Sequence, residues 1–204
     1  MKKSAEKKER ALGVKLFLKG GRCNSPKCAM IRRPYRPGIH GKKRRRALSE
    51  YGQQILEKQR IKVNYGLNET QMRRIFKKAL KKKSATGETM IENLERRLDN
   101  VIFRLGLSPS RITAKQYINH GHFLVNNRKV SIPSYGIKTG DIVSIKPRSK
   151  SLLIFKELPT IIKKYNPPDW LELDSEKLEG RIKSLPQNIE IPFDIDLVVD
   201  YYSK

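Results

Sequence analysis

Residues 89–105 carry apolar side chains at steps of three and four positions along the chain. On a helix of about 3.6 residues per turn, side chains at these steps form one continuous stripe. Such a stripe has to be covered, because its exposure to water is unfavourable. The sequence therefore predicts an amphipathic helix with one buried face, which Gly106 is expected to end. The members of the stripe are Met90, Leu94, Leu98, Val101, Ile102 and Leu105.

A second helix is predicted for residues 111–119. The Ser110 hydroxyl can cap its first turn, and Gly121 marks its expected end. Arg111 and Lys115 lie four positions apart, so the spacing predicts that both cations face the same way.

Three short strands are predicted to follow these helices. Residues 123–125 and 130–132 are joined by Asn126 and Asn127, which tolerate the left-handed backbone of a tight hairpin turn. Residues 142–146 form the third predicted strand. The sequence thus predicts a compact module of two helices packed on a curled β-hairpin.

The charge of the chain is strongly basic, with a formal net charge of +25 at pH 7 and a pI of about 10.2. Residues 166–204 hold nine acidic and four basic residues, so residues 1–165 carry a net charge of +30. This imbalance predicts a polyanionic partner on the basic part of the chain. No apolar run approaches the roughly 20 residues of a membrane helix. Because two cysteines do not make a disulfide framework, we expect a reducing, cytoplasmic location.

Residues 19–46 are rich in glycine and proline and show neither helical nor strand periodicity. We expect an extended basic segment without a core, whose side chains spread along a phosphate backbone. Tyr35 and His40 add planar groups that can stack on bases. A disordered basic arm or a localisation signal is the alternative interpretation. The candidate RNA-binding residues here are Arg32, Arg33, Tyr35, Arg36, His40, Lys42, Lys43, Arg44, Arg45 and Arg46.

Cys23 and Cys28 form a Cys-x4-Cys pair within this segment. Structural zinc takes four tetrahedral ligands, so the pair supplies half of a metal site. Two free thiols are the other interpretation. We expect no required cofactor, with zinc as the alternative.

Two further helices are predicted over residues 48–65 and 68–83. From residue 189 to residue 201 every odd position is apolar. A period of two predicts a half-buried strand or extended arm, which we expect to fold back on residues 48–83.

The predicted fold class is α+β, with three parts. Residues 1–46 are the extended basic N-terminal segment. Residues 47–88 together with 150–204 are a mainly helical domain, and residues 89–149 are the RNA-binding module inserted between its two halves.

Seven short motifs, spread in order over nearly the whole chain, carry a family resemblance. They are residues 14–19 (VKLFLK), 25–29 (SPKCA), 33–41 (RPYRPGIHG), 48–52 (LSEYG), 57–59 (EKQ), 94–101 (LERRLDNV) and 132–135 (IPSY). They resemble the bacterial-type small-subunit (30S) ribosomal protein S-four family. The pattern from Ser110 to Val130 also resembles the small RNA-binding module that this family shares with some pseudouridine synthases and a bacterial tyrosyl-tRNA synthetase.

The resemblance implies a structural constituent of the small ribosomal subunit. It implies a primary binder of the 5′ domain of 16S-type rRNA that nucleates assembly of the 30S body. It also implies contact with the fifth small-subunit ribosomal protein, an influence on translational accuracy, and a place near mRNA at the entry channel. In the module, it implies that RNA is held by its backbone through Arg111, Lys115, His120, His122 and Lys129.

The chain departs from the zinc-carrying members of the family it resembles. Those members have a Cys-x2-Cys pair where Glu6 and Glu9 stand here. Carboxylate oxygens are harder ligands than thiolates, so zinc binding is less favoured at a site with two glutamates in place of two cysteines.

Two other functions compete with this interpretation. Arg97-Leu98-Asp99 is similar to the motif around the catalytic aspartate of pseudouridine synthases, but Asp99 falls inside a predicted amphipathic helix. The chain also offers no catalytic domain and no acid–base pair for its three histidines, so we expect no enzyme. A nonspecific nucleic-acid chaperone is the second alternative, and the ordered module argues against it.

Overall fold

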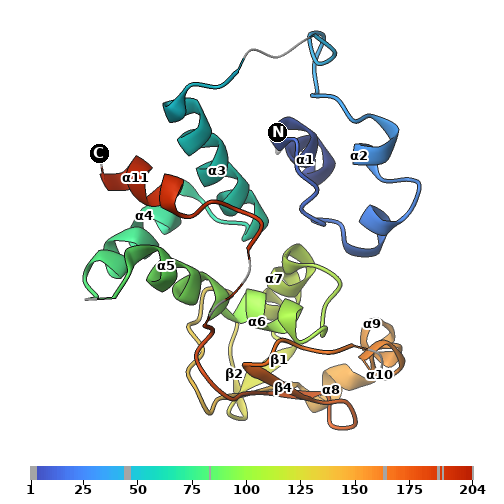
Figure 1. Ribbon diagram of the computed structural model, residues 1–204. Coiled ribbons are helices and arrows are strands. Elements are labelled where there is room, and N and C mark those ends of the chain that lie inside the picture. Colours follow the sequence, from blue (N-terminus) through green and yellow to red (C-terminus); the bar gives the residue numbers. More distant parts are fainter. Residues whose placement is uncertain are drawn as a thin grey trace. The chain divides into compact units, whose positions relative to one another are not determined.

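The computed structural model describes residues 4–43, 47–82, 84–162, 165–187, 189 and 191–203. The chain divides into two compact units (Figure 1). The first joins Met1–Met90 to Glu190–Lys204, and the second is Ile91–Ile189. The fold mixes helices with one antiparallel sheet, which agrees with the predicted α+β class. None of the described helices has the length and apolar character of a membrane span.

The first unit is helical. Ser49 begins α3, where its hydroxyl accepts the Gly52 amide at 3.2 Å. Asn68 and Gln71 form a reciprocal capping box at the start of α4. The elements are α1 (Ala5–Leu12), the 3-10 helix η1 (Gly20–Asn24), α2 (Ala29–Arg32), α3 (Glu50–Asn64), α4 (Glu69–Leu80), α11 (Asp196–Ser203) and α5 (Thr86–Glu95), which continues into the second unit.

Residues 4–43 fold around a small core, so the predicted extended segment without a core is wrong. The buried side chains are Leu12, Leu16, Leu18, Cys23 and Cys28. Helices α1 and α2 contain eight and four residues. Elements this short do not span the window in which a helical period can be recognised, which explains the missed prediction.

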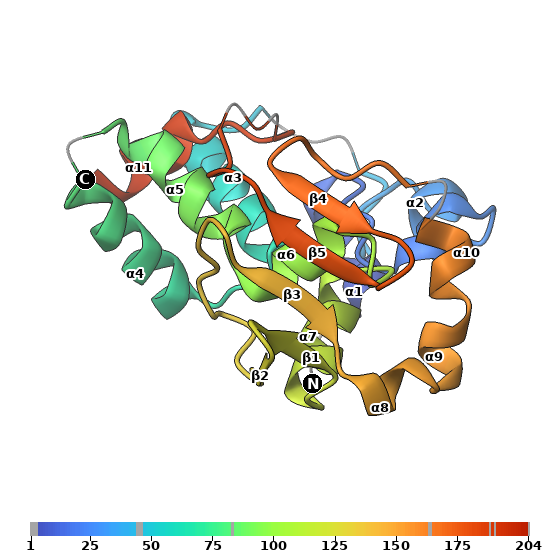
Figure 2. The ribbon, with the colours of Figure 1, turned by 90° about the horizontal axis from the view of Figure 1, so that it is seen from below.

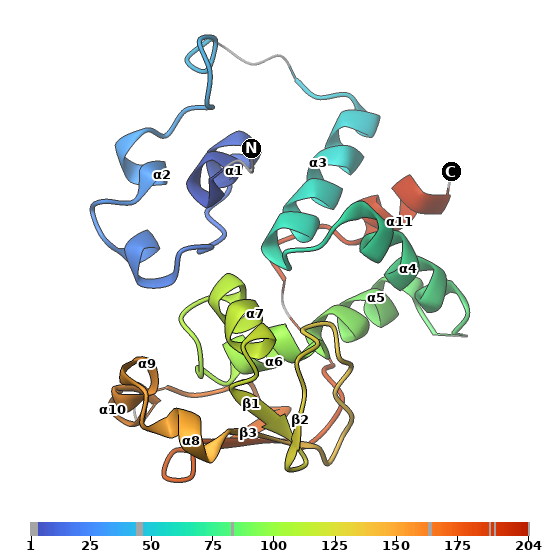
Figure 3. The same cartoon turned by 180° about the vertical axis from the view of Figure 1, so that it is seen from behind.

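The C-terminal helix α11 packs on α3 and α4, and these helices lie side by side in Figures 1 and 3. The ring of Tyr202 stacks on Phe76 with 5.1 Å between centroids, and the Tyr202 hydroxyl donates to Glu69 at 2.8 Å. Tyr201 stacks on Tyr51 at 5.9 Å. The C-terminal segment therefore returns to the helices inferred as its packing partners from the sequence.

The strand or extended arm predicted for residues 189–201 is wrong from Asp196 onward, because α11 begins there. Val198, Tyr201 and Tyr202 are three and four positions apart, so a helix also turns them to one face. The Asp194 carboxylate accepts two amides at the start of this helix. The alternating pattern was compatible with both structures, and the local cap favours the helix.

The Glu69 carboxyl has a pKa of about 2. Burial acts to raise this pKa, but hydrogen bonds from Lys62, Tyr202 and Lys58 outweigh burial. In an unfolded chain the glutamate carboxyl has a pKa of about 4.3. A lowered folded pKa means that the ionised carboxylate stabilises the unit above about pH 4 and that this stabilisation is lost as pH falls towards about 2.

Acid unfolding should therefore depend on Glu69. We expect Glu69→Gln to lose less stability than the parent protein between about pH 4 and pH 2, because the variant has no carboxylate to protonate. Circular dichroism during acid titration measures this. The exposed Glu172→Gln change is the control and should leave the acid profile unchanged. Identical profiles for Glu69→Gln and the parent protein would contradict the assignment.

The second unit is built on a five-stranded antiparallel sheet in the order β2-β1-β3-β5-β4 (Figure 2). Its strands are β1 (Phe123–Val125), β2 (Arg128–Lys129), β3 (Ile142–Ile145), β4 (Leu171–Asp174) and β5 (Glu179–Ile182). Its helices are α6 (Leu98–Arg104), α7 (Arg111–Asn119), α8 (Pro147–Lys150), α9 (Leu153–Lys156) and α10 (Leu158–Ile162). Helices α6 and α7 share one core with the sheet, which includes Leu98, Ile102, Leu105, Ile118, Phe123 and Val143.

The single helix predicted for residues 89–105 is divided into α5 and α6. Arg97 is extended, with φ −69° and ψ 138°. The amides of Leu98 and Asp99 donate to the carbonyl oxygens of Tyr135 and Pro133 instead of continuing the helix. The guanidinium of Arg97 binds both carboxylate oxygens of Asp99, at 3.0 and 2.6 Å, and both residues are buried.

The hairpin turn predicted at Asn126 and Asn127 is confirmed. Both residues have a left-handed backbone, with φ of 49° and 61°. Val125 lies opposite Arg128, so only two residues separate the strands. The second strand therefore begins at Arg128, and its predicted position at residues 130–132 is wrong.

Residues 150–189 lie in the second unit, so the predicted return to the helical domain at residue 150 is wrong. Strand β3, which confirms the strand predicted at residues 142–146, pairs with β5 on the side away from β1. Gly180 permits the close approach of β5 to α6, because a Cβ there would lie 2.3 Å from Leu105 Cδ1. The sheet thus gains two strands from a segment for which no strand was predicted.

Candidate nucleic-acid interface

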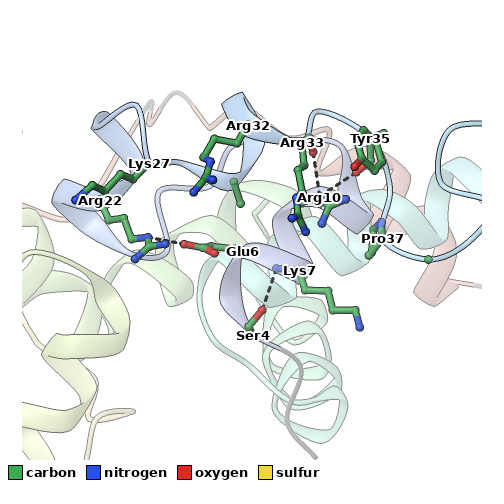
Figure 4. A pocket seen from close by; sticks show the side chains of 12 residues that line it. Ser4, Glu6, Lys7, Arg10, Arg22, Lys27, Arg32, Arg33, Tyr35 and Pro37 are labelled. Carbon is green, nitrogen blue, oxygen red and sulfur yellow. Dashed lines mark hydrogen bonds and ion pairs between the residues drawn. The ribbon is translucent and has the colours of Figure 1, made fainter.

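A basic hollow of about 600 Å³ lies in the N-terminal part of the first unit (Figure 4). Six cationic side chains and one carboxylate line it. A concentration of positive charge in a hollow attracts phosphate groups. The lining residues are Ser4, Glu6, Lys7, Arg10, Arg22, Lys27, Ala29, Arg32, Arg33, Tyr35, Pro37 and Gly38.

Arg10 holds the loop that lines the hollow. Its Nε donates to the carbonyl oxygens of Arg33 at 3.0 Å and Tyr35 at 2.9 Å, as the dashed lines of Figure 4 show. Its Nη2 donates to the carbonyl oxygen of Arg36 at 3.4 Å. The guanidinium also lies 5.0 Å from the centre of the Tyr35 ring. Arg10 therefore positions the loop that carries neighbouring cations.

The predicted residues of this segment fall into three groups. Arg32 and Arg33 are exposed and line the hollow. Tyr35 is half-buried, and Lys42 Nζ lies 5.3 Å from its ring centre, so the ring is engaged by two cations. Arg36, His40, Lys42 and Lys43 are exposed beyond the lining. The predicted contacts Arg44, Arg45 and Arg46 lie outside the described residues.

Four lining residues were not predicted from the sequence, namely Lys7, Arg10, Arg22 and Lys27. Lys7 and Arg10 are three positions apart on α1, a spacing that places them on one face. That spacing was the available signal. Arg22 and Lys27 reach the hollow only because η1 and the following loop fold back on α1, which the spacing of residues does not reveal.

Arg111, at the start of α7, is held by neighbouring side chains. Its Nε donates to Asn100 Oδ1 at 2.7 Å, and its guanidinium lies 4.5 Å from the Phe103 ring centre. Asn100 in turn donates to the buried carboxylate of Glu95 at 2.7 Å, which also binds Arg104. The Arg111 guanidinium is thus fixed in place.

The remaining predicted cations of the module lie along α7 and the hairpin. Lys115 is half-buried one turn after Arg111, and His120 is exposed at the end of the helix. The exposed Lys129 on β2 lies across Gly121, where a Cβ would be 2.3 Å from Lys129 Cε. The hairpin and the end of α7 therefore bring Lys129 to the turn that follows His120.

His122 differs from the other predicted contacts, because its ring is packed. Its Nδ1 lies 3.0 Å from Ser149 Oγ, and its ring meets the edges of Tyr117 and Phe155. Burial, together with His120 and Lys146, lowers the pKa of His122 below its usual value. The shift favours the neutral ring, so His122 supplies less charge to this surface than an ordinary histidine.

Cys23 and Cys28 are buried free thiols. Burial raises the pKa of the Cys23 thiol, Glu9 adds to the rise, and a hydrogen bond at Lys19 opposes it. Among the described residues, no group of three or more His, Cys, Asp and Glu side chains is arranged to hold a metal ion. The residues present therefore do not fit a structural zinc ion.

Comparisons with known proteins cover both units. Residues 1–95 match the family model described as the ribosomal protein S4/S9 N-terminal domain, and residues 96–143 match the S4 domain. The small ribosomal subunit protein uS4 of Caldicellulosiruptor bescii is 50% identical over 194 residues, which are 94% of this chain and 93% of that protein. The chain belongs to the uS4 family. Proteins named uS4 from Halothermothrix orenii and Acetivibrio thermocellus are each 46% identical over 194 residues, again 94% of this chain and 93% of theirs.

Membership in the uS4 family confirms the resemblance drawn from the seven motifs. It also confirms that the chain is a non-catalytic protein, so the RNA-modifying enzyme is excluded. The boundary between the two family models falls at the last residue of α5. The S4 domain match ends before β4 and β5.

Proposed function

We propose that this uS4 family member is a structural constituent of the small subunit of the cytoplasmic ribosome and binds 16S-type rRNA through a basic surface in each unit. The basic hollow carries this proposal, because six cations converge there in a chain that matches uS4 proteins over 94% of its length. Phosphate contacts position a protein on RNA and give salt-dependent affinity.

The first proposed RNA surface is the hollow together with the exposed cations that follow it. Lys7, Lys27, Arg32 and Arg33 contact phosphates, while Arg10 shapes the loop. Arg36, His40, Lys42 and Lys43 extend the surface along the RNA backbone. Arg44, Arg45 and Arg46 lie outside the described residues and are proposed as further contacts from the sequence alone. The Tyr35 ring lies against the cations of Arg10 and Lys42, and it supports the surface by holding them.

The second proposed surface is formed by α7 and the hairpin. Arg111, Lys115, His120 and Lys129 contact the RNA backbone there. The fixed guanidinium of Arg111 supports this role, because a side chain already held in place loses less conformational freedom on binding.

The family relationship supports a more specific role. We infer binding to the 5′ domain of the rRNA and nucleation of the 30S body. The fifth small-subunit ribosomal protein is the proposed neighbour with which the chain influences accuracy, near mRNA at the entry channel. The exposed carboxylates of Asp194, Asp196 and Asp200 favour a protein neighbour or solvent over RNA for the C-terminal segment. Crosslinks from this segment mainly to rRNA would contradict that assignment.

A salt series tests the function. The purified protein is titrated with the 5′ domain of small-subunit rRNA and with an unrelated structured RNA of equal length. We expect a preference for the 5′ domain that persists at high salt, because shape-specific contacts add to the electrostatic ones. Equal affinities that fall together with salt would mean that only charge is recognised, as in a nonspecific chaperone.

Charge reversal on α7 tests the second surface. We expect Arg111→Glu with Lys115→Glu to weaken rRNA binding and to flatten the slope of log K against log salt by about one unit per lost contact. The control is Lys177→Glu with Lys183→Glu, which changes the net charge equally in the acidic part of the same unit. An unchanged slope in the Arg111 and Lys115 variant would exclude both residues from phosphate contact.

A further inference from the structure

Glu9 places a carboxylate inside the N-terminal segment. The residue lies on α1 and is 1% exposed. Its Oε1 accepts the backbone amides of Leu16 and Leu18, each at 3.1 Å. A buried carboxylate is unfavourable unless hydrogen bonds replace its hydration. The two amides therefore stabilise the carboxylate, and the carboxylate fixes the positions of the two amides.

The two amides flank a left-handed turn. Phe17, between them, has φ of 54°, a conformation that is unfavourable for a residue with a side chain. Nearby backbone amides that point at one site form a concavity that binds anions. The Glu9 oxygen fills this concavity and so stabilises the turn.

The turn positions the small core of the segment. Leu16 and Leu18 are buried together with Cys23 and Cys28. The contact between Glu9 and the amides therefore fixes the backbone on which this core is built. The next residue, Arg10, fixes the loop of residues 33–36, so two adjacent residues of α1 organise both the core and the hollow.

These contacts leave no complete set of ligands for zinc. Structural zinc takes four deprotonated ligands. The Oε1 of Glu9 already accepts two amides, and Glu6 Oε1 lies 2.8 Å from Arg22 Nε. Cys23 and Cys28 remain as an incomplete pair.

We propose that the Glu9 carboxylate, in place of a metal ion, holds residues 4–43 in their fold, so that the hollow is formed without zinc and before RNA binds. The thiols of Cys23 and Cys28 then serve as apolar core groups. The proposal rests on the proposed function only for the identity of RNA as the ligand of the hollow.

Amide hydrogen exchange tests this proposal on the full-length protein in EDTA, without RNA. We expect the Leu16 and Leu18 amides to be protected in the parent protein and to exchange about 100-fold faster in Glu9→Ala. Glu6→Ala is the matched control, because it removes from the same helix a carboxylate that lies beside Arg22 and not at these two amides. In Glu6→Ala the Leu16 and Leu18 amides should exchange within about threefold of their rates in the parent protein. Unprotected amides in the parent protein would overturn the proposal.

A second variant tests the same proposal if Glu9→Ala does not fold. Cys23→Ala with Cys28→Ala removes both thiols and keeps Glu9. We expect its Leu16 and Leu18 amides to stay protected, and we expect metal analysis of the parent protein, purified with added zinc, to find far less than one ion per chain. One bound zinc per chain, or loss of protection in the double-alanine variant, would overturn the proposal. Failure of rRNA binding would leave these results unchanged, because the exchange is measured without RNA.

Discussion

Replacing Asp99 by alanine should lower the free energy of unfolding of the second unit by about 3–5 kcal/mol. The side chains of Arg97 and Asp99 are 7% and 5% exposed. The change leaves the Arg97 guanidinium buried without its carboxylate, and an unpaired buried charge strongly destabilises a fold. Urea unfolding followed by the fluorescence of Trp170 measures this, because the only tryptophan of the chain is buried in this unit.

Two controls identify the cause of that loss. Glu172 and Lys183 form a pair at 3.8 Å with both side chains 53% exposed, so Glu172→Ala should change stability by about 1 kcal/mol at most. Arg97→Met with Asp99→Leu removes both charges and should recover part of the stability lost in Asp99→Ala. An Asp99→Ala loss no larger than that of Glu172→Ala would contradict the importance of the buried pair.

Reversing Arg32 and Arg33 to glutamate should weaken rRNA binding by at least about 100-fold at moderate salt. The expectation follows from roughly 1.5–3 kcal/mol for each hydrogen bond to a charged group. The slope of log K against log salt should flatten by about 1.4–1.8, because two phosphate contacts are lost. Both arginines are exposed, so the change buries no new charge. Filter binding across a salt series gives both quantities.

The matched control for this prediction is again Lys177→Glu with Lys183→Glu. It changes the net charge by the same amount in the acidic part of the chain, where no RNA contact is proposed. A similar loss of affinity in both double variants would show that total charge, and not the hollow, governs binding. Circular dichroism of each variant establishes that the fold is retained.

Features that depend on neighbouring residues were predictable from the sequence. Ser49 and Asn68 begin helices where their side chains can accept amides of the first turn. Asn126 and Asn127 form the hairpin turn because both tolerate a left-handed backbone. The exposed arginines Arg32 and Arg33 were recognisable from the cationic run alone.

Features that depend on distant partners were not predictable in this way. Helix α5 ends before Arg97 because the carbonyl oxygens of Tyr135 and Pro133 accept the amides that follow, and β5 becomes a strand because it pairs with the edge of β3. Likewise, Glu9 and Arg10 lie within an ordinary charged stretch of sequence. Only the folded chain brings the Leu16 and Leu18 amides to Glu9 and the carbonyl oxygens of Arg33 and Tyr35 to Arg10.

The contact between Tyr202 and Glu69 has a consequence for the order in which the protein forms. Its two residues are 133 positions apart, and residues 91–189 lie between them. During synthesis the second unit is therefore complete before α11 emerges, and it can fold while α3 and α4 still lack their cover. A chain interrupted during translation would expose the faces of α3 and α4 that α11 covers in the folded protein. These faces are covered only when Tyr201 and Tyr202 pack on them.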